Sequence, residues 1–293
     1  MSHLSLRISL PRPSLRSDER NVLGFSGCRQ AVLDSGIGSK EVVTMQGQAR
    51  RSAEPGDRAD EAPPKTRAER RPTITVLICT LNEQASLPHV LPRIPDWVDE
   101  VLLVDGHSTD NTVAVAKELR PDTRVLYQPD RGKGAALRYG IGEAAGDIIV
   151  TLDADGQTDP AELPRFVEAI QRGHDFAKGT RFRRPFSRSR PIHRIAGNWI
   201  ITLTFNLLFF RLYTDVCSGY NAFRKQAVKA VDLSHPDGLA DEPLLHARVR
   251  KAGLRVTEVP HRDPPRTAGD SKAPSWQQGF GAIKTIVRER FRG

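Results

Sequence analysis

The chain has 293 residues, 38% of them apolar, and a formal net charge of +9. This is enough for one large α/β domain with an appendage. The three cysteines, Cys28, Cys79 and Cys217, lack a metal-binding spacing. They indicate free, buried thiols in a reducing compartment rather than a disulfide framework, so we expect a cytoplasmic protein. The positive charge accompanies no recognised nucleic-acid-binding module, and we do not expect a nucleic acid as partner.

Residues 1–71 differ in composition from the rest of the chain. They are rich in Arg, Ser, Pro and Gly, and the stretch 46–71 has almost no large apolar side chain. Such a segment cannot bury enough apolar surface to fold, so we predict a disordered basic tail. The tail lacks the apolar centre of a signal peptide, and its acidic residues Asp18, Glu19 and Asp34 argue against a transit peptide.

Strand and helix patterns alternate after the tail. Three short apolar runs, rich in β-branched residues, predict strands at 73–79, 101–104 and 148–152. Helical patterns lie between these runs, at 86–93, 111–119 and 134–145. Strands that alternate with helices predict a parallel sheet, whose ligands gather at the carboxyl ends of the strands.

Two carboxylates, Asp153 and Asp155, follow the third apolar run directly. Asp159 before Pro160 predicts the start of the next helix, so the pair lies on a loop between a strand and a helix. Mg²⁺ or Mn²⁺ takes a few protein oxygens and completes its shell with water and phosphate, so these two carboxylates with Gln157 would suffice. An isolated Asp-x-Asp is a weak signal, and turn and capping chemistry explains it better than a metal site does.

Five motifs occur in one order between the predicted strands. They are Thr80-Leu81-Asn82-Glu83, Val104-Asp105 with Ser108-Thr109-Asp110, Arg131-Gly132-Lys133-Gly134, Leu152 to Gln157, and Lys178-Gly179-Thr180-Arg181. Together they resemble the family 2 glycosyltransferases with the GT-A fold, and most of all the dolichyl- or polyprenyl-phosphate sugar synthases. Later segments are also similar to that family: Asp215 to Tyr220, Asp241-Glu242, Val259-Pro260 and Arg266.

The resemblance covers roughly residues 72–272. It implies an α/β, Rossmann-like, mostly parallel sheet flanked by helices. We expect the disordered tail at 1–71 before this domain and a C-terminal helical extension at 273–293 after it. The resemblance also implies a nucleotide-sugar donor, a GDP- or UDP-hexose, and a Mg²⁺ or Mn²⁺ cofactor. The residues that it assigns to the donor are Thr80, Leu81, Asn82, Glu83, Asp105, Lys133, Asp153, Ala154 and Asp155, and those that it assigns to the metal are Asp153, Asp155 and Gln157.

Some of these residues have simpler explanations. Glu83 could cap the helix that follows it, and Lys133 could be a solvated lysine at a helix start. The family commonly has two adjacent acids where this chain has Asp105 and Gly106, so the base preference stays open. His107 fits a loop residue better than a catalyst, because no acid–base partner can be assigned to it.

The segment 176–214 has eight basic residues and no Asp or Glu. It overlaps the apolar stretch 199–210, which is too short and too interrupted to span a bilayer. An arginine cluster beside such a helix suits peripheral contact with an anionic membrane, with Trp199 at the headgroup level. A core helix flanked by a solvated basic loop fits the pattern equally well.

The acceptor decides which catalytic groups are needed. A lipid monophosphate is already ionised near neutral pH, so it needs arginines for placement, and Arg181 and Arg194 are the candidates. A hydroxyl acceptor needs a general base, for which Asp241 or Glu242 is the candidate. We therefore predict a metal-dependent, inverting transfer of a hexose to a polyprenyl phosphate. The alternatives are a soluble transferase acting on a small hydroxyl acceptor and a binding module without turnover.

Overall fold

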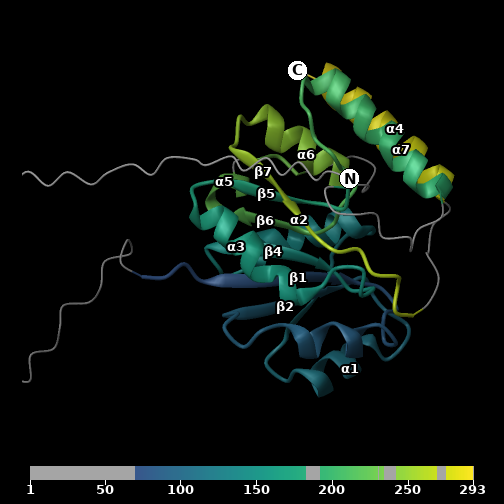
Figure 1. Ribbon diagram of the computed structural model, residues 1–293. Helices are drawn as coiled ribbons and strands as arrows, with labels where there is room; N and C mark the ends of the chain where they lie inside the picture. Colours follow the sequence, from purple (N-terminus) through teal and green to yellow (C-terminus); the bar gives the residue numbers. More distant parts are fainter. Residues whose placement is uncertain (1–69, 183–191, 230, 234–241, 269–274, 293) are drawn as a thin grey trace, which may run out of the picture. The chain divides into compact units, whose positions relative to one another are not determined.

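The computed structural model describes residues 70–182, 192–229, 231–233, 242–268 and 275–292. These residues form a seven-stranded sheet in the order β3-β2-β1-β4-β6-β5-β7 (Figure 1). The strands are β1 (Ile74–Thr80), β2 (Glu100–Asp105), β3 (Arg124–Tyr127), β4 (Ile148–Asp153), β5 (Phe176–Thr180), β6 (Asn221–Arg224) and β7 (Val256–Pro260). The helices are α1 (Thr112–Leu119), α2 (Lys133–Glu143), α3 (Leu163–Gln171), α4 (Ile192–Phe209), α5 (Lys225–Lys229), α6 (Glu242–Lys251) and α7 (Ser275–Phe291).

The sheet is mostly parallel, as predicted. β1 lies between β2 and β4 and runs parallel to both, and β2 runs parallel to β3. Only β6 is antiparallel to its neighbours, β4 and β5. Cys79 of β1 is level with Val104 of β2 and with Asp153 of β4. The polar segments that follow these three strands therefore start at one edge of the sheet.

Alternation along the strands builds a core on each face of the sheet. In β1, Val76 and Ile78 face a cluster that includes Phe166 of α3, whereas Leu77 faces a cluster that includes Ile141 of α2. Side chains that alternate between two buried faces are typical of a strand in the middle of a sheet covered on both sides. The periodicity found in the sequence thus corresponds to a three-layer arrangement of helices, sheet and helices.

The prediction of an α-helix at 86–93 was wrong. The segment forms two short 3₁₀ turns, Leu87–His89 and Leu91–Arg93. Pro88 and Pro92 lie inside these turns, and each lacks the N–H that an α-helix would need and crowds the preceding turn. The apolar spacing is still satisfied, because Leu87 and Leu91 are buried in the core.

Helices α4 and α7 pack against each other, and α6 packs against both (Figure 1). Ile201, Phe205 and Phe209 of α4 join Ile286 of α7 in a third apolar cluster. The same helix α4 exposes other large apolar side chains, namely Trp199, Ile200, Leu203 and Leu207. One side of α4 therefore packs in the core and the other is exposed, and membrane contact stays a prediction. None of the helices in the described ranges is both long and apolar enough to cross a bilayer.

The tail up to residue 69 and the basic residues Arg183, Arg184, Arg188 and Arg190 lie outside the described residues, as does Asp241. The predicted C-terminal helix is present as α7. The predicted division into tail, central domain and extension stays a prediction.

Cys79 and Cys217 are free thiols, but both are half-buried rather than fully buried. Burial raises the pKa of Cys79 to about 12, which keeps it protonated at neutral pH.

Candidate functional site

Asp153 is the last residue of β4, and Asp155 lies in the turn that follows. The turn is held by its own polar groups: the backbone N–H of Gln157 donates to Asp155, and Thr158 Oγ1 accepts a bond from the N–H of Asp153. Burial, followed by the charge of Asp153, raises the pKa of Asp155. Two carboxylates held this close repel each other, which makes the turn a favourable place for a cation.

Lys133 lies between Asp153 and Glu242. Its Nζ donates to Asp153 Oδ1 at 2.7 Å and to Glu242 Oε1 at 2.5 Å. Loss of hydration opposes the charged ammonium, but the two carboxylates outweigh that effect and raise the pKa of Lys133 well above its usual value. The first residue of α2, Lys133, thus places a positive charge in the site, and the first residue of α6, Glu242, places a carboxylate there. Lys133 is therefore not merely a solvated lysine at a helix start.

A second cation, Arg266, reaches the same turn from the segment after β7. Its Nη2 donates to Asp155 Oδ2 at 3.1 Å, and its Nη1 lies 3.8 Å from Glu83 Oε1. Thr267 also binds the turn, because its backbone N–H donates to the carbonyl of Asp155. The sequence analysis placed Arg266 in a family-like segment without giving it a role. Nothing in local spacing connects it to residues 111 positions away.

The donor set fits a hard divalent cation. Asp153 and Asp155 offer only oxygen atoms, and each already faces a positive nitrogen, from Lys133 and Arg266. Gly219 leaves the necessary room, since a Cβ there would collide with both carboxylate oxygens of Asp153. In the described part of the chain, no three His, Cys, Asp or Glu side chains gather into a complete metal site. The remaining ligands would come from water and a bound phosphate, as Mg²⁺ prefers.

The residues predicted to bind the nucleoside lie together at the ends of β1 and β2. Asp105 is almost fully buried and accepts bonds from Thr80 Oγ1, Ser108 Oγ and the Ser108 N–H. Asn82 has a positive φ of 51°, and its side-chain oxygen accepts the N–H of Thr109. These hydrogen bonds connect the loop after β1 to the loop after β2, so the two loops hold this conformation without a ligand.

Glu83, Leu81 and His107 complete this group. Glu83 accepts the Ser86 hydroxyl and, through its carbonyl, the N–H of Leu87, so it does cap the following turn while its other oxygen faces Arg266. Leu81 is exposed. His107 Nε2 donates to the carbonyl of Gln128 at 2.9 Å, which agrees with a loop role for this histidine.

Arg181 has a partner that the sequence analysis did not foresee. Its Nε and Nη2 donate to the two oxygens of Asp215, at 2.6 and 2.9 Å, and the two side chains are only 9% and 0% exposed. Burial alone would raise the pKa of Asp215, but Arg181 reverses this and holds it far below its usual range. Arg194 lies in the first turn of α4 and is half-buried. The assignment of both arginines to an acceptor phosphate stays a prediction.

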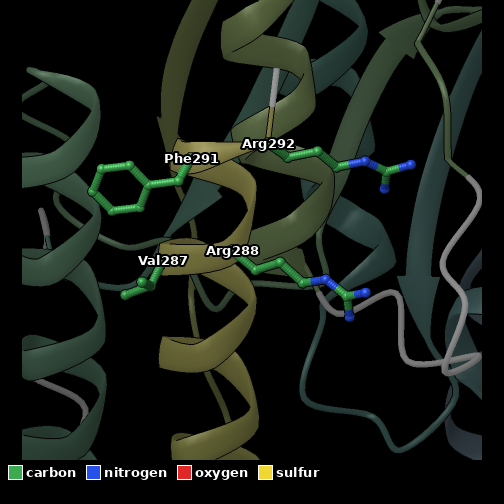
Figure 2. A pocket seen from close by; sticks show the side chains of 4 residues that line it. All are labelled: Val287, Arg288, Phe291 and Arg292. Carbon is green, nitrogen blue, oxygen red and sulfur yellow. The ribbon is translucent and has the colours of Figure 1, made fainter.

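Ala154 and Gln157 contribute differently from the carboxylates beside them. Ala154 is buried in the core under the turn, so only its backbone can face a donor. Gln157 is half-buried, and its N–H supports Asp155. One surface hollow lies elsewhere, at the C-terminal end of α7, and is lined by Val287, Arg288, Phe291 and Arg292 (Figure 2). It contains none of the residues predicted for the site.

Comparison with known proteins identifies the family of this chain. The model of the family described as glycosyl transferase family 2 matches residues 75–232, more than half of the chain. A relative from Mycobacterium tuberculosis, named an uncharacterized glycosyltransferase, is 33% identical over 214 residues, which are 70% of this chain and 92% of the relative. An undecaprenyl-phosphate mannosyltransferase from Micrococcus luteus is 33% identical over 215 residues, 68% of this chain and 86% of that one.

The fold also matches solved structures. Glucosyl-3-phosphoglycerate synthase from Mycobacterium tuberculosis, solved with Mg²⁺ and UDP, superposes with a TM-score of 0.60 at 22% identity. The match covers 74% of this chain and 79% of the solved one. At this identity the similarity supports the fold, and it carries no conclusion about the acceptor.

Proposed function

Since the chain belongs to the family 2 glycosyltransferases, we propose that it transfers a hexose from a nucleoside-diphosphate sugar to a polyprenyl phosphate. The proposal includes a divalent cation held by Asp153 and Asp155. Its main support is the meeting of four charged groups at the end of β4, where two carboxylates face Lys133 and Arg266. A diphosphate with its cation matches this arrangement of alternating charges.

Mg²⁺ or Mn²⁺, when bound, would act as a Lewis acid toward the departing nucleoside diphosphate. The protein's own residues would bind the cation, the diphosphate and the nucleoside. Asp153 and Asp155 would hold the cation, with Gln157 supporting the turn. Lys133 and Arg266 would release the carboxylates and turn toward the phosphate oxygens, where their positive charge has a new partner. Thr80, Asn82, Glu83 and Asp105 would line the nucleoside end.

The acceptor is inferred from two independent observations. The Micrococcus luteus relative is named for undecaprenyl phosphate. In addition, α4 and α7 expose large apolar side chains, including Leu203 and Leu207 of α4 and Phe280 and Phe291 of α7. Figure 2 shows Val287 and Phe291 on one side of α7 and Arg288 and Arg292 on the other. Apolar side chains next to arginines suit peripheral contact with a membrane that carries anionic lipid, on its cytoplasmic face.

A second function remains supported by one contact. Glu242 Oε1 lies 2.5 Å from the same Lys133 that binds Asp153, so a carboxylate from α6 reaches the site. With a hydroxyl acceptor, that carboxylate is in the right region to take the proton. With a phosphate acceptor, it has no proton to remove, and its role is to hold Lys133.

The deciding experiment offers purified protein and Mn²⁺ a panel of nucleotide sugars, with polyprenyl phosphate or with small hydroxyl acceptors. We expect transfer to polyprenyl phosphate, and Glu242→Gln should reduce it less than about tenfold because no base is required. Transfer only to hydroxyl acceptors, with Glu242→Gln inactive, would establish the second function instead.

Membrane contact is tested separately by sedimentation with anionic vesicles. Leu207→Glu places a charge on the exposed side of α4 and should weaken vesicle binding. Gln171→Glu, at the exposed end of α3, is the matched control and should bind vesicles as the unaltered protein does. Equal binding of both variants would remove α4 from the membrane contact.

A further inference from the structure

Ser218 and Gly219, in the segment between α4 and β6, lie against the turn after β4. A Cβ at position 219 would collide with both carboxylate oxygens of Asp153, so the backbone there borders that carboxylate directly. Thr151 Oγ1 donates to the carbonyl of Gly219 at 2.7 Å, and Asn221 Nδ2 donates to the carbonyl of Ser218 at 3.1 Å. This backbone therefore forms one fixed side of the space around Asp153.

The hydroxyl of Ser218 is hydrogen-bonded to His261, which directly follows β7. Ser218 Oγ lies 2.9 Å from His261 Nε2, and each of the two residues is only 2% exposed. His261 Nδ1 lies 2.7 Å from the carbonyl oxygen of Arg262, which can only accept, so Nδ1 carries the ring proton. Nε2 is then the acceptor and the hydroxyl the donor. Burial lowers the pKa of His261, which favours this neutral form.

Strand β5 holds both partners of this hydrogen bond. A Cβ at Gly179 would lie 2.8 Å from Ser218 Oγ and 2.8 Å from His261 Cδ2, so only glycine leaves room for the two side chains. The N–H of Gly179 donates to the carbonyl of Tyr220 at 2.8 Å, and the N–H of His261 donates to the carbonyl of Thr180 at 3.0 Å. The hydrogen bond is therefore built into the sheet.

His261 also begins the segment that reaches the second carboxylate of the turn. Five residues later, Arg266 Nη2 donates to Asp155 Oδ2 at 3.1 Å. The N–H of Thr267 donates to the carbonyl of Asp155 at 3.2 Å. The two prolines at 264–265 lie in between, and each fixes its own φ and restricts the residue before it. A displacement of His261 is therefore passed on to Arg266 rather than absorbed by this short connection.

We propose that the hydrogen bond between Ser218 and His261 positions Asp153 and Asp155 for the cation. This inference rests on the proposed function, because that function includes the cation. The bond joins the segment that borders Asp153 to the segment that holds Asp155. A cation such as Mg²⁺ needs its oxygen ligands at about 2.0–2.1 Å in nearly fixed directions, so a small shift of either carboxylate weakens its binding. Ser218 and His261 are positioning residues, which act on the cation only through these carboxylates.

The test measures Mn²⁺ binding to the full chain in saturating UDP, by electron paramagnetic resonance of the free ion. Ser218→Ala removes the donor. His261→Asn keeps an amide donor for the carbonyl of Arg262 but lacks the atom that reaches Ser218. Each variant should weaken Mn²⁺ binding by about tenfold or more, as the loss of a residue that orients a metal ligand does. The double variant should lose no more than either single one, because both remove the same bond.

Thr75→Val is the matched control for the loss of a buried hydroxyl. Thr75 is 0% exposed, lies at the far end of β1 from the site, and donates through Oγ1 to Glu100 Oε2 at 2.6 Å. This variant should lose stability in urea and bind Mn²⁺ as the unaltered protein does. Ser218→Cys, which fills the same space with a weaker donor, serves if Ser218→Ala does not fold, and should weaken Mn²⁺ binding at least about threefold.

Mn²⁺ affinities of the Ser218 and His261 variants within about twofold of the unaltered protein would overturn the positioning role. So would a double variant whose loss is the product of the two single losses, since the residues would then act independently. An equal loss in Thr75→Val would trace the effect to general stability and would also overturn it. If the unaltered protein binds no Mn²⁺ with UDP, the proposed function itself fails, which is distinct from intact binding in the variants.

Discussion

Two of the regions in which cations meet carboxylates, one after β4 and one after β5, differ in exposure. After β4, Lys133 is 51% exposed and its partner Asp153 27%, while Arg266 and Asp155 are 24% and 14% exposed. After β5, Arg181 and Asp215 are 9% and 0% exposed and bind through two hydrogen bonds. A buried pair cannot exchange partners without leaving an unpaired charge, whereas a partly hydrated pair can. The first region is thus suited to ligand exchange and the second to holding the fold.

The largest effect is expected from Asp153→Ala, on activity. Removing one of the two carboxylates should lower kcat/KM for transfer by about a thousandfold or more, roughly 4 kcal/mol, because the cation and the departing diphosphate lose their support. Excess EDTA should have the same effect. Asp122→Ala, at an exposed surface pair, is the control and should keep normal kinetics. Full activity of Asp153→Ala in a donor-turnover assay would contradict an exchangeable cation site.

Asp215→Ala should act on stability instead. It leaves the Arg181 guanidinium buried without its partner, which costs about 3 kcal/mol or more in the free energy of unfolding. Urea denaturation measures the change, and Asp122→Ala again serves as the exposed control, with an expected loss below about 1 kcal/mol. A loss for Asp215→Ala as small as that of the control would mean that the two regions do not differ.

Lowering the pH should reduce the free energy of unfolding through the same buried pair, Arg181 and Asp215. Arg181 keeps the pKa of folded Asp215 far below its usual range, so the stabilising contribution is complete above the unfolded value of about 3.9. It is lost as the pH falls below that value toward the folded pKa. Unfolding free energies measured between pH 5 and about pH 2 should therefore fall more steeply in the unaltered protein than in Asp215→Asn. Parallel curves would show that Asp215 is not the group that titrates.

The smallest effect on stability is expected from Arg266→Ala. The pair with Asp155 is partly exposed, so its loss should change the free energy of unfolding by less than about 1 kcal/mol. UDP binding with Mn²⁺ should nevertheless weaken by about tenfold, because a charge-assisted bond to the diphosphate is lost. Arg255→Ala, which breaks an exposed pair with Asp175, should leave UDP binding unchanged. A large loss of stability without a loss of affinity would place Arg266 with the structural pairs.

Local sequence patterns were reliable where the chain is regular. The β-branched runs, and the polar residues that end them, predicted β1, β2 and β4 and the positions of Asp105, Asp153 and Asp155. They failed at 86–93, where apolar spacing indicated an α-helix and two prolines produced 3₁₀ turns. Periodicity reports which side chains face the core, and it does not report whether the backbone N–H groups can complete a helix.

The sequence by itself determined the family, the mostly parallel sheet and the carboxylates at its edge, because each depends on neighbouring residues or on motifs in order. Only the tertiary structure decided which cation meets which carboxylate. The hydrogen-bonded partners are far apart in the sequence: Arg181 and Asp215 by 34 positions, Lys133 and Glu242 by 109, and Arg266 and Asp155 by 111. The burial of an ion pair depends on residues that only the fold brings together. That burial distinguishes the partly exposed pairs after β4, which can exchange partners with a ligand, from the buried pair after β5, which cannot.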